Sequence, residues 1–202
     1  MTRTVLSSAV VLSLALSAGA HAAPAIIGQP APDFTLTDVD GKTVHLADFK
    51  GRHVVLEWNN PACPFVKKHY ETQNMQSLQR KYDKDVVWLT VNSAHPGNGA
   101  YLDNAALKSY VSAQKASPAA YLPDPQGKAG LAYGALATPA MYVINPAGTL
   151  VYAGAIDDKP STDKADVKTA RNYVVAALDE SRAGKHVSVA KTTAYGCHIA
   201  YN

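Results

Sequence analysis

Residues 54–70 of the chain read VVLEWNNPACPFVKKHY. The apolar run at 54–58 is typical of a buried central strand, and residues 59–62 form a short loop that ends at Cys63. Pro64 follows directly, and proline is favoured at the first position of a helix because its missing N–H would have no partner there. This stretch therefore predicts a strand, a loop and a helix, with Cys63 as the N-cap residue.

Cys63 is the candidate nucleophile of the chain. At the N-cap, its sulfur would accept hydrogen bonds from the N–H groups of Phe65 and Val66, and the positive end of the helix dipole would favour an anion. Both effects lower the pKa of a thiol, and the thiolate is the reactive form. Lys67, one turn on, would add a positive charge on the same side. The alternatives are an inert buried cysteine or one half of a structural disulfide.

Apolar patterns predict the other elements. A hairpin is expected at 34–45 around Asp40-Gly41. Further strands are expected at 86–91, 140–144 and 150–153, and helices at 64–82, 104–114, 127–133 and 166–183. Asn104 is the expected N-cap of the second helix, and Gly184 ends the last one. This order predicts an α/β fold: a mixed central sheet with helices on both faces, an N-terminal β-hairpin and a C-terminal tail.

The N-terminus has the pattern of a secretion signal. Arg3 precedes a small apolar run at 5–18, and Ala20-His21-Ala22 provides the small residues of a cleavage site. We therefore expect a cleaved signal peptide at 1–22, a domain at 23–184 and a tail at 185–202, in a bacterial protein of the periplasm or secreted from the cell. A buried N-terminal helix or an uncleaved anchor is the alternative. No 18-residue apolar span follows, so no membrane span is expected after cleavage.

Composition and charge exclude several classes of protein. Of the 202 residues, 47% are hydrophobic and 17% are charged, which excludes a disordered chain. The net charge of +3 is weak, and no basic run exceeds the pair Lys67-Lys68, so nucleic-acid binding is excluded. The two cysteines, Cys63 and Cys197, are too few for a disulfide-rich scaffold or a four-cysteine zinc site.

Several short motifs occur together along the chain. They are the segments 28–36 (GQPAPDFTL), 40–42 (DGK), 49–51 (FKG), 60–65 (NPACPF), 133–134 (YG), 138–139 (TP) and 145–148 (NPAG). With these motifs, the chain from about residue 27 to its C-terminus resembles the peroxiredoxin-like branch of the thioredoxin superfamily. This is the redoxin group of alkyl hydroperoxide reductases and thiol-specific antioxidant proteins.

The resemblance implies a thioredoxin-like fold and a thiol-based antioxidant oxidoreductase, with Cys63 as its redox nucleophile and no cofactor. It also implies a cis-proline loop at Thr138-Pro139 that faces Cys63 and presents the Thr138 backbone to a bound thiol or peptide; an ordinary trans turn is the alternative. Asn60, Pro64, Thr138 and Pro139 are the expected substrate-binding residues. The substrate would be a thiol, a disulfide or a peroxide, with an electron donor that the sequence does not identify.

The chain also departs from the pattern of this family. Thioredoxin-type reductases carry a second cysteine three residues after the first, where this chain has Val66. Peroxiredoxins carry a proline and a Thr or Ser where this chain has Leu56 and Asn60, and no arginine occurs between Arg80 and Arg171 to polarise a peroxide. These departures put fast peroxidase chemistry in doubt and leave slower thiolate chemistry possible.

The second cysteine lies near the C-terminus, in the motif Tyr195-Gly196-Cys197-His198, which looks like the tails of peroxiredoxin-like relatives. Cys197 can be a resolving cysteine for oxidised Cys63, half of a static Cys63–Cys197 disulfide, or an unpaired thiol. A static bridge that closes 134 residues would stabilise the fold by roughly 4 to 5 kcal/mol in the chain-entropy model. The second functional reading is thus a non-catalytic binding module stapled by this disulfide.

A metal site at Cys63 is a further alternative. A copper-binding thioredoxin-fold protein would use Cys63 with His69 or His198, but such relatives use two cysteines three apart plus a histidine. His69 lies six residues past Cys63, does not share its helix face, and is expected to be a packed or surface histidine. No metal site is therefore predicted. Asp157-Asp158 and Asp163 are expected to form a solvated acidic loop.

Overall fold

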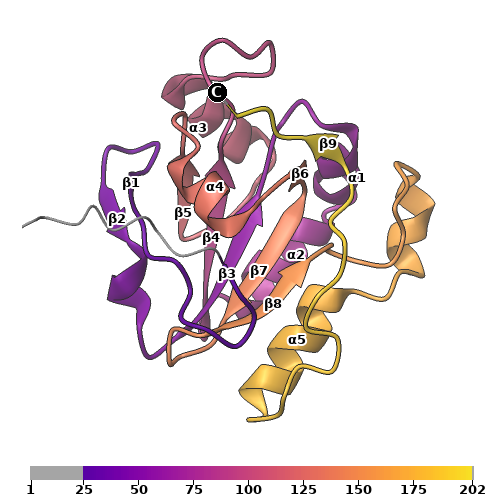
Figure 1. Ribbon diagram of the computed structural model, residues 1–202. Coiled ribbons are helices and arrows are strands. Elements are labelled where there is room, and N and C mark those ends of the chain that lie inside the picture. Colours follow the sequence, from indigo (N-terminus) through magenta and orange to yellow (C-terminus); the bar gives the residue numbers. More distant parts are fainter. Residues whose placement is uncertain (1–24, 202) are drawn as a thin grey trace, which may run out of the picture.

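The computed structural model describes residues 25–201 (Figure 1). The expected signal peptide at 1–22 lies outside the described residues, and the domain boundaries expected at 22 and 184 stay predictions. Within 25–201, no helix has both the length and the apolar character needed to cross a membrane.

A five-stranded mixed sheet forms the centre of the molecule, in the order β5-β4-β3-β7-β8. Its strands are β3 (His53–Trp58), β4 (Val86–Asn92), β5 (Ala120–Pro123), β7 (Ala140–Ile144) and β8 (Leu150–Gly154). Strands β3, β4 and β5 are parallel, whereas β7 and β8 are antiparallel to their neighbours. The central strand β3 is buried along its whole length, as expected from the apolar run at 54–58.

Two hydrophobic clusters cover the two faces of this sheet. Because side chains alternate along a strand, Val54, Leu56 and Trp58 belong to one cluster and Val55 to the other. The helices α1 (Pro64–Glu71), α2 (Asn74–Tyr82) and α5 (Tyr173–Arg182) supply the Val55 side, and α4 (Lys128–Tyr133) supplies the other. Helix α3 (Asn104–Ala113) packs beside β5. The expected mixed sheet with helices on both faces is confirmed.

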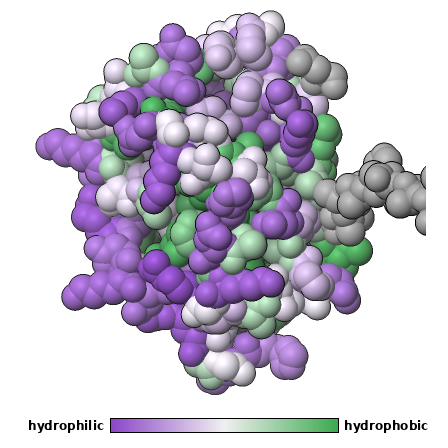
Figure 2. Space-filling view, turned by 90° about the vertical axis from the view of Figure 1, so that its left-hand side faces the viewer, coloured by the Kyte–Doolittle hydropathy of each residue, from purple (hydrophilic) through white to green (hydrophobic). Residues whose placement is uncertain are grey.

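The hairpin of β1 (Thr35–Thr37) and β2 (Thr43–His45) packs on the α4 side of the sheet. Its turn contains Gly41 at φ 84°, a conformation that glycine adopts without a steric penalty. The hairpin expected from the sequence is therefore confirmed. On this side of the molecule, polar side chains surround a central patch of apolar ones (Figure 2).

The prediction of a single long helix at 64–82 is wrong, because the helix is interrupted between α1 and α2. Gln73 adopts the left-handed conformation, with φ 61°, which a continuous right-handed helix does not contain. The Thr72 hydroxyl donates to the carbonyl of Lys68 at 2.7 Å, which is a local hydrogen bond that competes with helix continuation. The apolar period continues through the break, so periodicity alone did not detect it.

Two further helix boundaries also differ from expectation. The N-cap of α3 is Asp103, whose carboxylate accepts from the N–H of Ala106 at 2.8 Å, and not Asn104. The helix expected at 166–183 consists of a 3-10 helix, η2 (Lys164–Lys168), followed by α5. Asn172 caps α5 by accepting from the N–H of Val175 at 2.9 Å. In both places an Asp or Asn side chain accepts a hydrogen bond from the first turn of the helix and so determines where the helix begins.

The C-terminal tail crosses the molecule in extended form (Figure 1, yellow). It first runs beside β8, where Ala153 donates to the carbonyl of Ala190 and accepts from the N–H of Thr192. Its last part forms β9 (Cys197–His198), which pairs antiparallel with the short strand β6 (Ala137–Thr138). The sequence predicted neither of these two-residue strands, nor β5, because such short runs show no period.

The capping of α3 can be tested by substitution. We expect Asp103→Ala to lower the free energy of unfolding by about 1 kcal/mol, because an N–H of the first turn loses its acceptor. Asn104→Ala is the matched control and should change it little, since alanine is the better helix former at that position. Urea unfolding followed by circular dichroism measures both. An equal loss in the two variants would contradict the assignment of Asp103.

Candidate functional site

Cys63 lies where the sequence placed it, at the N-cap of α1 with Pro64 in the first turn. The carbonyl of Cys63 accepts from the N–H of Lys67 at 2.9 Å, as the first hydrogen bond of the helix. The residue is 2% exposed and belongs to the cluster on the α1 side of the sheet. The end of β3 and the loop after it thus fix the cysteine at the positive end of the α1 dipole.

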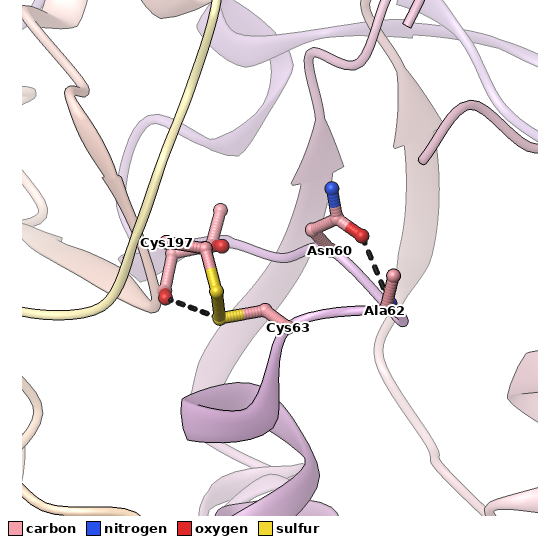
Figure 3. The surroundings of a disulfide bond; sticks show 5 residues. Asn60, Ala62, Cys63 and Cys197 are labelled. Atoms are coloured by element: carbon pink, nitrogen blue, oxygen red, sulfur yellow. Dashed lines mark hydrogen bonds between the residues drawn. A yellow bond between two sulfur atoms is a disulfide. The ribbon is translucent and has the colours of Figure 1, made fainter. Parts of the chain in front are cut away.

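Cys197 meets Cys63 from the opposite direction. The structure joins the two residues by a disulfide, with their Cα atoms 5.8 Å apart (Figure 3). This separation lies within the usual range for a disulfide. Cys197 is carried by β9 and is partly exposed, whereas Cys63 is buried, so the two residues of the bridge differ in their exposure to solvent.

The expected hydrogen bonds from the first turn of α1 to the sulfur are absent, since Cys63 makes no side-chain cap contact. Its sulfur instead lies 3.1 Å from the carbonyl oxygen of Thr138. A disulfide sulfur has no proton to donate, so this is a close contact in the oxidised protein; a reduced thiol in the same place would donate to that oxygen.

The other expected site residues lie around this bridge. The Thr138-Pro139 peptide bond is cis, which confirms the expected cis-proline loop. Asn60 accepts from the N–H of Ala62 at 2.9 Å (Figure 3), so its side chain shapes the loop before Cys63. Asn60 and Thr138 also line one small hollow beside the tail residues 198–200. Their roles in binding a substrate stay predictions.

A buried polar cluster that the sequence did not predict lies on the α1 side of the bridge. It joins Lys68 and His69 of α1, Asp157 after β8, and Tyr195 of the tail. Lys68 is 1% exposed, His69 is fully buried and Asp157 is 2% exposed. The expectation that Asp157 is solvated is therefore wrong, because the tail covers it. Asp158, its neighbour, is exposed as expected.

Tyr195 connects the members of this polar cluster. Its hydroxyl donates to Asp157 Oδ1 at 2.5 Å, and lies 3.4 Å from His69 Nε2 and 3.5 Å from Lys68 Nζ. Lys68 Nζ also donates to the carbonyl of Lys159 at 2.9 Å. The second carboxylate oxygen of Asp157 has no hydrogen-bond partner among the described residues. Tyr195 thus supplies the contact through which the tail meets the buried charges.

His69 is neutral at physiological pH. Burial lowers its pKa to about 3, and the charge of the neighbouring Lys68 acts in the same direction. The side-chain amide of Asn74 donates to Nδ1 at 2.8 Å, which places the ring proton on Nε2, facing Tyr195. The 3.9 Å separation between Nε2 and the Asp157 carboxylate is therefore not an ion pair at neutral pH.

Lys68 and Glu57 also titrate away from their ordinary values. Burial lowers the pKa of Lys68, and the negative charge of Asp157 opposes this effect. Burial raises the pKa of Glu57, although the hydrogen bonds that its carboxylate accepts offset part of the effect. The closest donors to Glu57 are Tyr70 at 2.7 Å and Trp88 at 2.8 Å.

The sequence could have indicated the buried Glu57, but not the polar cluster around Tyr195. Glu57 interrupts the apolar run at 54–58 with a charge in the middle of the central strand, and a charge there is seldom buried without partners. That signal was available. The polar cluster joins segments that are 126 residues apart in the chain, so no local pattern predicts it.

The buried neutral His69 predicts a pH dependence of stability. Below pH 6.5 the unfolded chain binds a proton at His69 that the folded chain, with its pKa of about 3, does not bind. This contribution to stability is present above pH 6.5 and is lost as the pH falls towards 3, by about 1.4 kcal/mol per pH unit. Between pH 8 and pH 5 we expect the wild type to lose about 2 kcal/mol more than His69→Gln in urea unfolding.

His186→Gln is the control, because His186 is exposed on the tail. Its profile should follow that of the wild type. His53, whose pKa is also lowered by burial, is present in all three proteins and cancels in the comparison. Parallel profiles for wild type and His69→Gln would show that His69 is not buried in the neutral form.

Comparison with known proteins identifies relatives of this chain in sequence and in structure. The thiol-disulfide oxidoreductase ResA of Bacillus thuringiensis subsp. konkukian (strain 97-27) is 29% identical over 126 residues, which are 62% of this chain and 67% of the relative. The structure of an uncharacterized conserved protein from Geobacillus kaustophilus superposes with a TM-score of 0.75 and 26% identity, over 88% of this chain and 93% of that one.

The exposed lipoprotein thioredoxin Etrx1 from Streptococcus pneumoniae strain TIGR4 is a more distant structural neighbour. It has a TM-score of 0.51 and 27% identity, over 68% of this chain and 98% of its own. The sequence pattern of the AhpC/TSA family matches residues 27–153, from before β1 into β8. Because this match spans more than half of the chain, the protein belongs to the AhpC/TSA family, within the thioredoxin superfamily.

Proposed function

We propose that this protein is an exported thiol–disulfide oxidoreductase in which Cys63 is the nucleophile and Cys197 its redox partner. The supporting observation is the Cys63–Cys197 bridge at the N-terminus of α1, in contact with the Thr138 carbonyl. A cysteine at this end of a helix is the arrangement that stabilises a thiolate. The name of the relative ResA describes the same class of reaction.

The chemistry that we propose is an exchange of thiolates and disulfides. In the reduced protein, the Cys63 thiolate attacks one sulfur of a substrate disulfide, and the other substrate sulfur leaves with the electron pair and takes up a proton. Cys197 then attacks the sulfur of Cys63 and releases the substrate as a dithiol. The protein is oxidised to the disulfide seen here, and a donor dithiol must reduce it for another turnover.

The difference in exposure between the two cysteines suggests where that donor attacks. Cys63 is almost fully buried, whereas Cys197 is partly exposed. An incoming donor thiolate therefore reaches Cys197, and Cys63 leaves as the thiolate that the helix dipole stabilises. The second thiol of the donor then attacks the mixed disulfide on Cys197 and frees it.

The alternative is a binding module in which the bridge only fastens the tail. The burial of Ile199 and the packing of Tyr201 against the core favour this second candidate, because a tail that is held by its own contacts would not need to move. Within 25–201, no group of three or more His, Cys, Asp or Glu residues is arranged to hold a metal ion.

The redox state of the bridge in glutathione buffers distinguishes the two candidates. For an oxidoreductase we expect a reduction potential above about −300 mV, since structural disulfides of exported proteins lie below that value. Thiol trapping after equilibration with reduced and oxidised glutathione measures it. The reduced Cys197→Ala variant should also react with iodoacetamide with a midpoint below about pH 8.5, the value for a free thiol. A bridge that resists glutathione and a midpoint at or above that pH would favour the structural role.

We do not expect an antioxidant role through fast peroxide reduction. Leu56 and Asn60 replace the peroxide-activating residues of peroxiredoxins, and such contacts act on the charge that develops in the transition state. We therefore expect hydrogen peroxide to oxidise Cys63 slowly, as measured by stopped-flow fluorescence of the reduced protein. A rate that approaches the diffusion limit would contradict this expectation and favour a peroxidase.

A further inference from the structure

The tail pairs with the β6 strand in the way that a peptide from another molecule could pair with it. β9 pairs antiparallel with β6, with Cys197 opposite Thr138 and His198 opposite Ala137. The next residue, Ile199, donates its N–H to the carbonyl of Leu136 at 3.0 Å. A strand that adds to a free sheet edge in this way obtains its affinity from main-chain hydrogen bonds and its specificity from side-chain pockets.

The position before the cysteine has no room for a side chain. A Cβ added to Gly196 would lie far inside the van der Waals contact distance from the Thr138 carbonyl oxygen, and Gly196 has φ 133°. Both observations restrict this position to glycine, because only glycine combines that backbone conformation with so close an approach.

The position two residues before the cysteine has a pocket. The ring of Tyr195 packs edge-on against Phe65 at 5.8 Å between centroids, and Lys68 Nζ lies 5.3 Å from the ring centre. Its hydroxyl donates to Asp157, an almost fully buried carboxylate. An aromatic ring with a hydroxyl fits this pocket, whereas a smaller side chain would leave Asp157 without that donor.

We propose that the tail segment Tyr195-Gly196-Cys197 is an internal copy of the sequence that this site recognises. The partner is an extended segment of another protein with a disulfide-bonded cysteine, glycine before it and tyrosine two positions before it. This inference rests on the proposed function, because the segment reacts with Cys63.

The substrate segment and the tail would alternate on β6 during one turnover. With the protein reduced and the tail displaced, the segment pairs with β6 and Cys63 attacks its cysteine sulfur. The second sulfur of the substrate disulfide leaves with the electron pair. Cys197 then attacks Cys63, the bond between Cys63 and the substrate breaks, and the tail replaces the segment on the strand. In this half of the cycle two electrons pass from the protein dithiol to the substrate disulfide, and the donor dithiol then returns two electrons to the protein.

Peptide substrates test this recognition directly. The full chain with Cys197→Ser is mixed with acetylated peptides that have the sequence Thr-Ala-X-Z-Cys, each with its cysteine bonded to thionitrobenzoate. Release of the coloured thiolate gives the second-order rate constant. Each value is divided by the rate of the same peptide with free glutathione, which removes differences in intrinsic reactivity. The tail competes equally with all peptides.

The expected order of rates follows from the contacts of Tyr195 and Gly196. Relative to Tyr-Gly-Cys, we expect Phe-Gly-Cys to react about fivefold more slowly, because it lacks the hydrogen bond to Asp157. Ala-Gly-Cys should be slower by about tenfold or more, because the ring contacts are lost as well. Tyr-Val-Cys should be slower by about tenfold or more, because its side chain meets the Thr138 carbonyl.

A pair of surface variants assigns the preference to the pocket. Phe65→Ala in the Cys197→Ser chain should reduce the ratio of Tyr-Gly-Cys to Ala-Gly-Cys by about threefold, because one wall of the pocket is lost. Glu71→Ala, an exposed residue of the same helix, should leave that ratio unchanged. Equal rates for all four peptides would overturn this inference and leave the proposed exchange chemistry intact. Failure of every peptide and of free thionitrobenzoate disulfide to react would overturn the proposed function itself.

Discussion

The contact of the Thr138 carbonyl with Cys63 brings three distant parts of the chain to one point. Cys63 arrives on α1, which the end of β3 positions. Thr138 arrives on β6, and Cys197 arrives on the tail strand that pairs with it. The Cα atoms of the two cysteines lie 5.8 Å apart, inside the range of about 4.4 to 6.8 Å that a disulfide permits, so the bridge depends on the placement of all three segments. The pairing of the tail with β6 brings Cys197 to Cys63.

The tail also determines the electrostatics beside the bridge. Lys68, His69 and Asp157 are all buried, and burial of charges costs free energy unless they have partners. Tyr195 meets all three through one hydroxyl group, as a donor to the carboxylate. Departure of the tail would let water reach these groups. The protonation of His69 and the docking of the tail are therefore coupled, because both depend on the same desolvated space.

The sequence predicted the centre of the fold better than its edges. The run at 54–58 and the Cys63-Pro64 helix start followed from local chemistry, whereas the cis-proline loop followed from the family resemblance, and all three are confirmed. The break at Gln73 was missed because the apolar period continues across it. The strand β9 was missed because two residues have no period and because its paired residues in β6 lie 59 and 61 positions earlier in the chain. The cluster around Tyr195 needed tertiary structure, since its contacts cross from α1 to the tail.

The closed ring formed by the disulfide has a mechanical consequence. The two bridged cysteines are 134 positions apart in the sequence. Most of the central sheet therefore lies within one covalent loop. A force applied to the two ends of the oxidised chain acts along the bridge and cannot extend the segment between the cysteines. At about 3.5 Å per residue, roughly 470 Å of contour length is withheld from stretching. Any machine that pulls this chain through a narrow pore would have to thread the oxidised protein as a double strand, and the reduced protein as a single one.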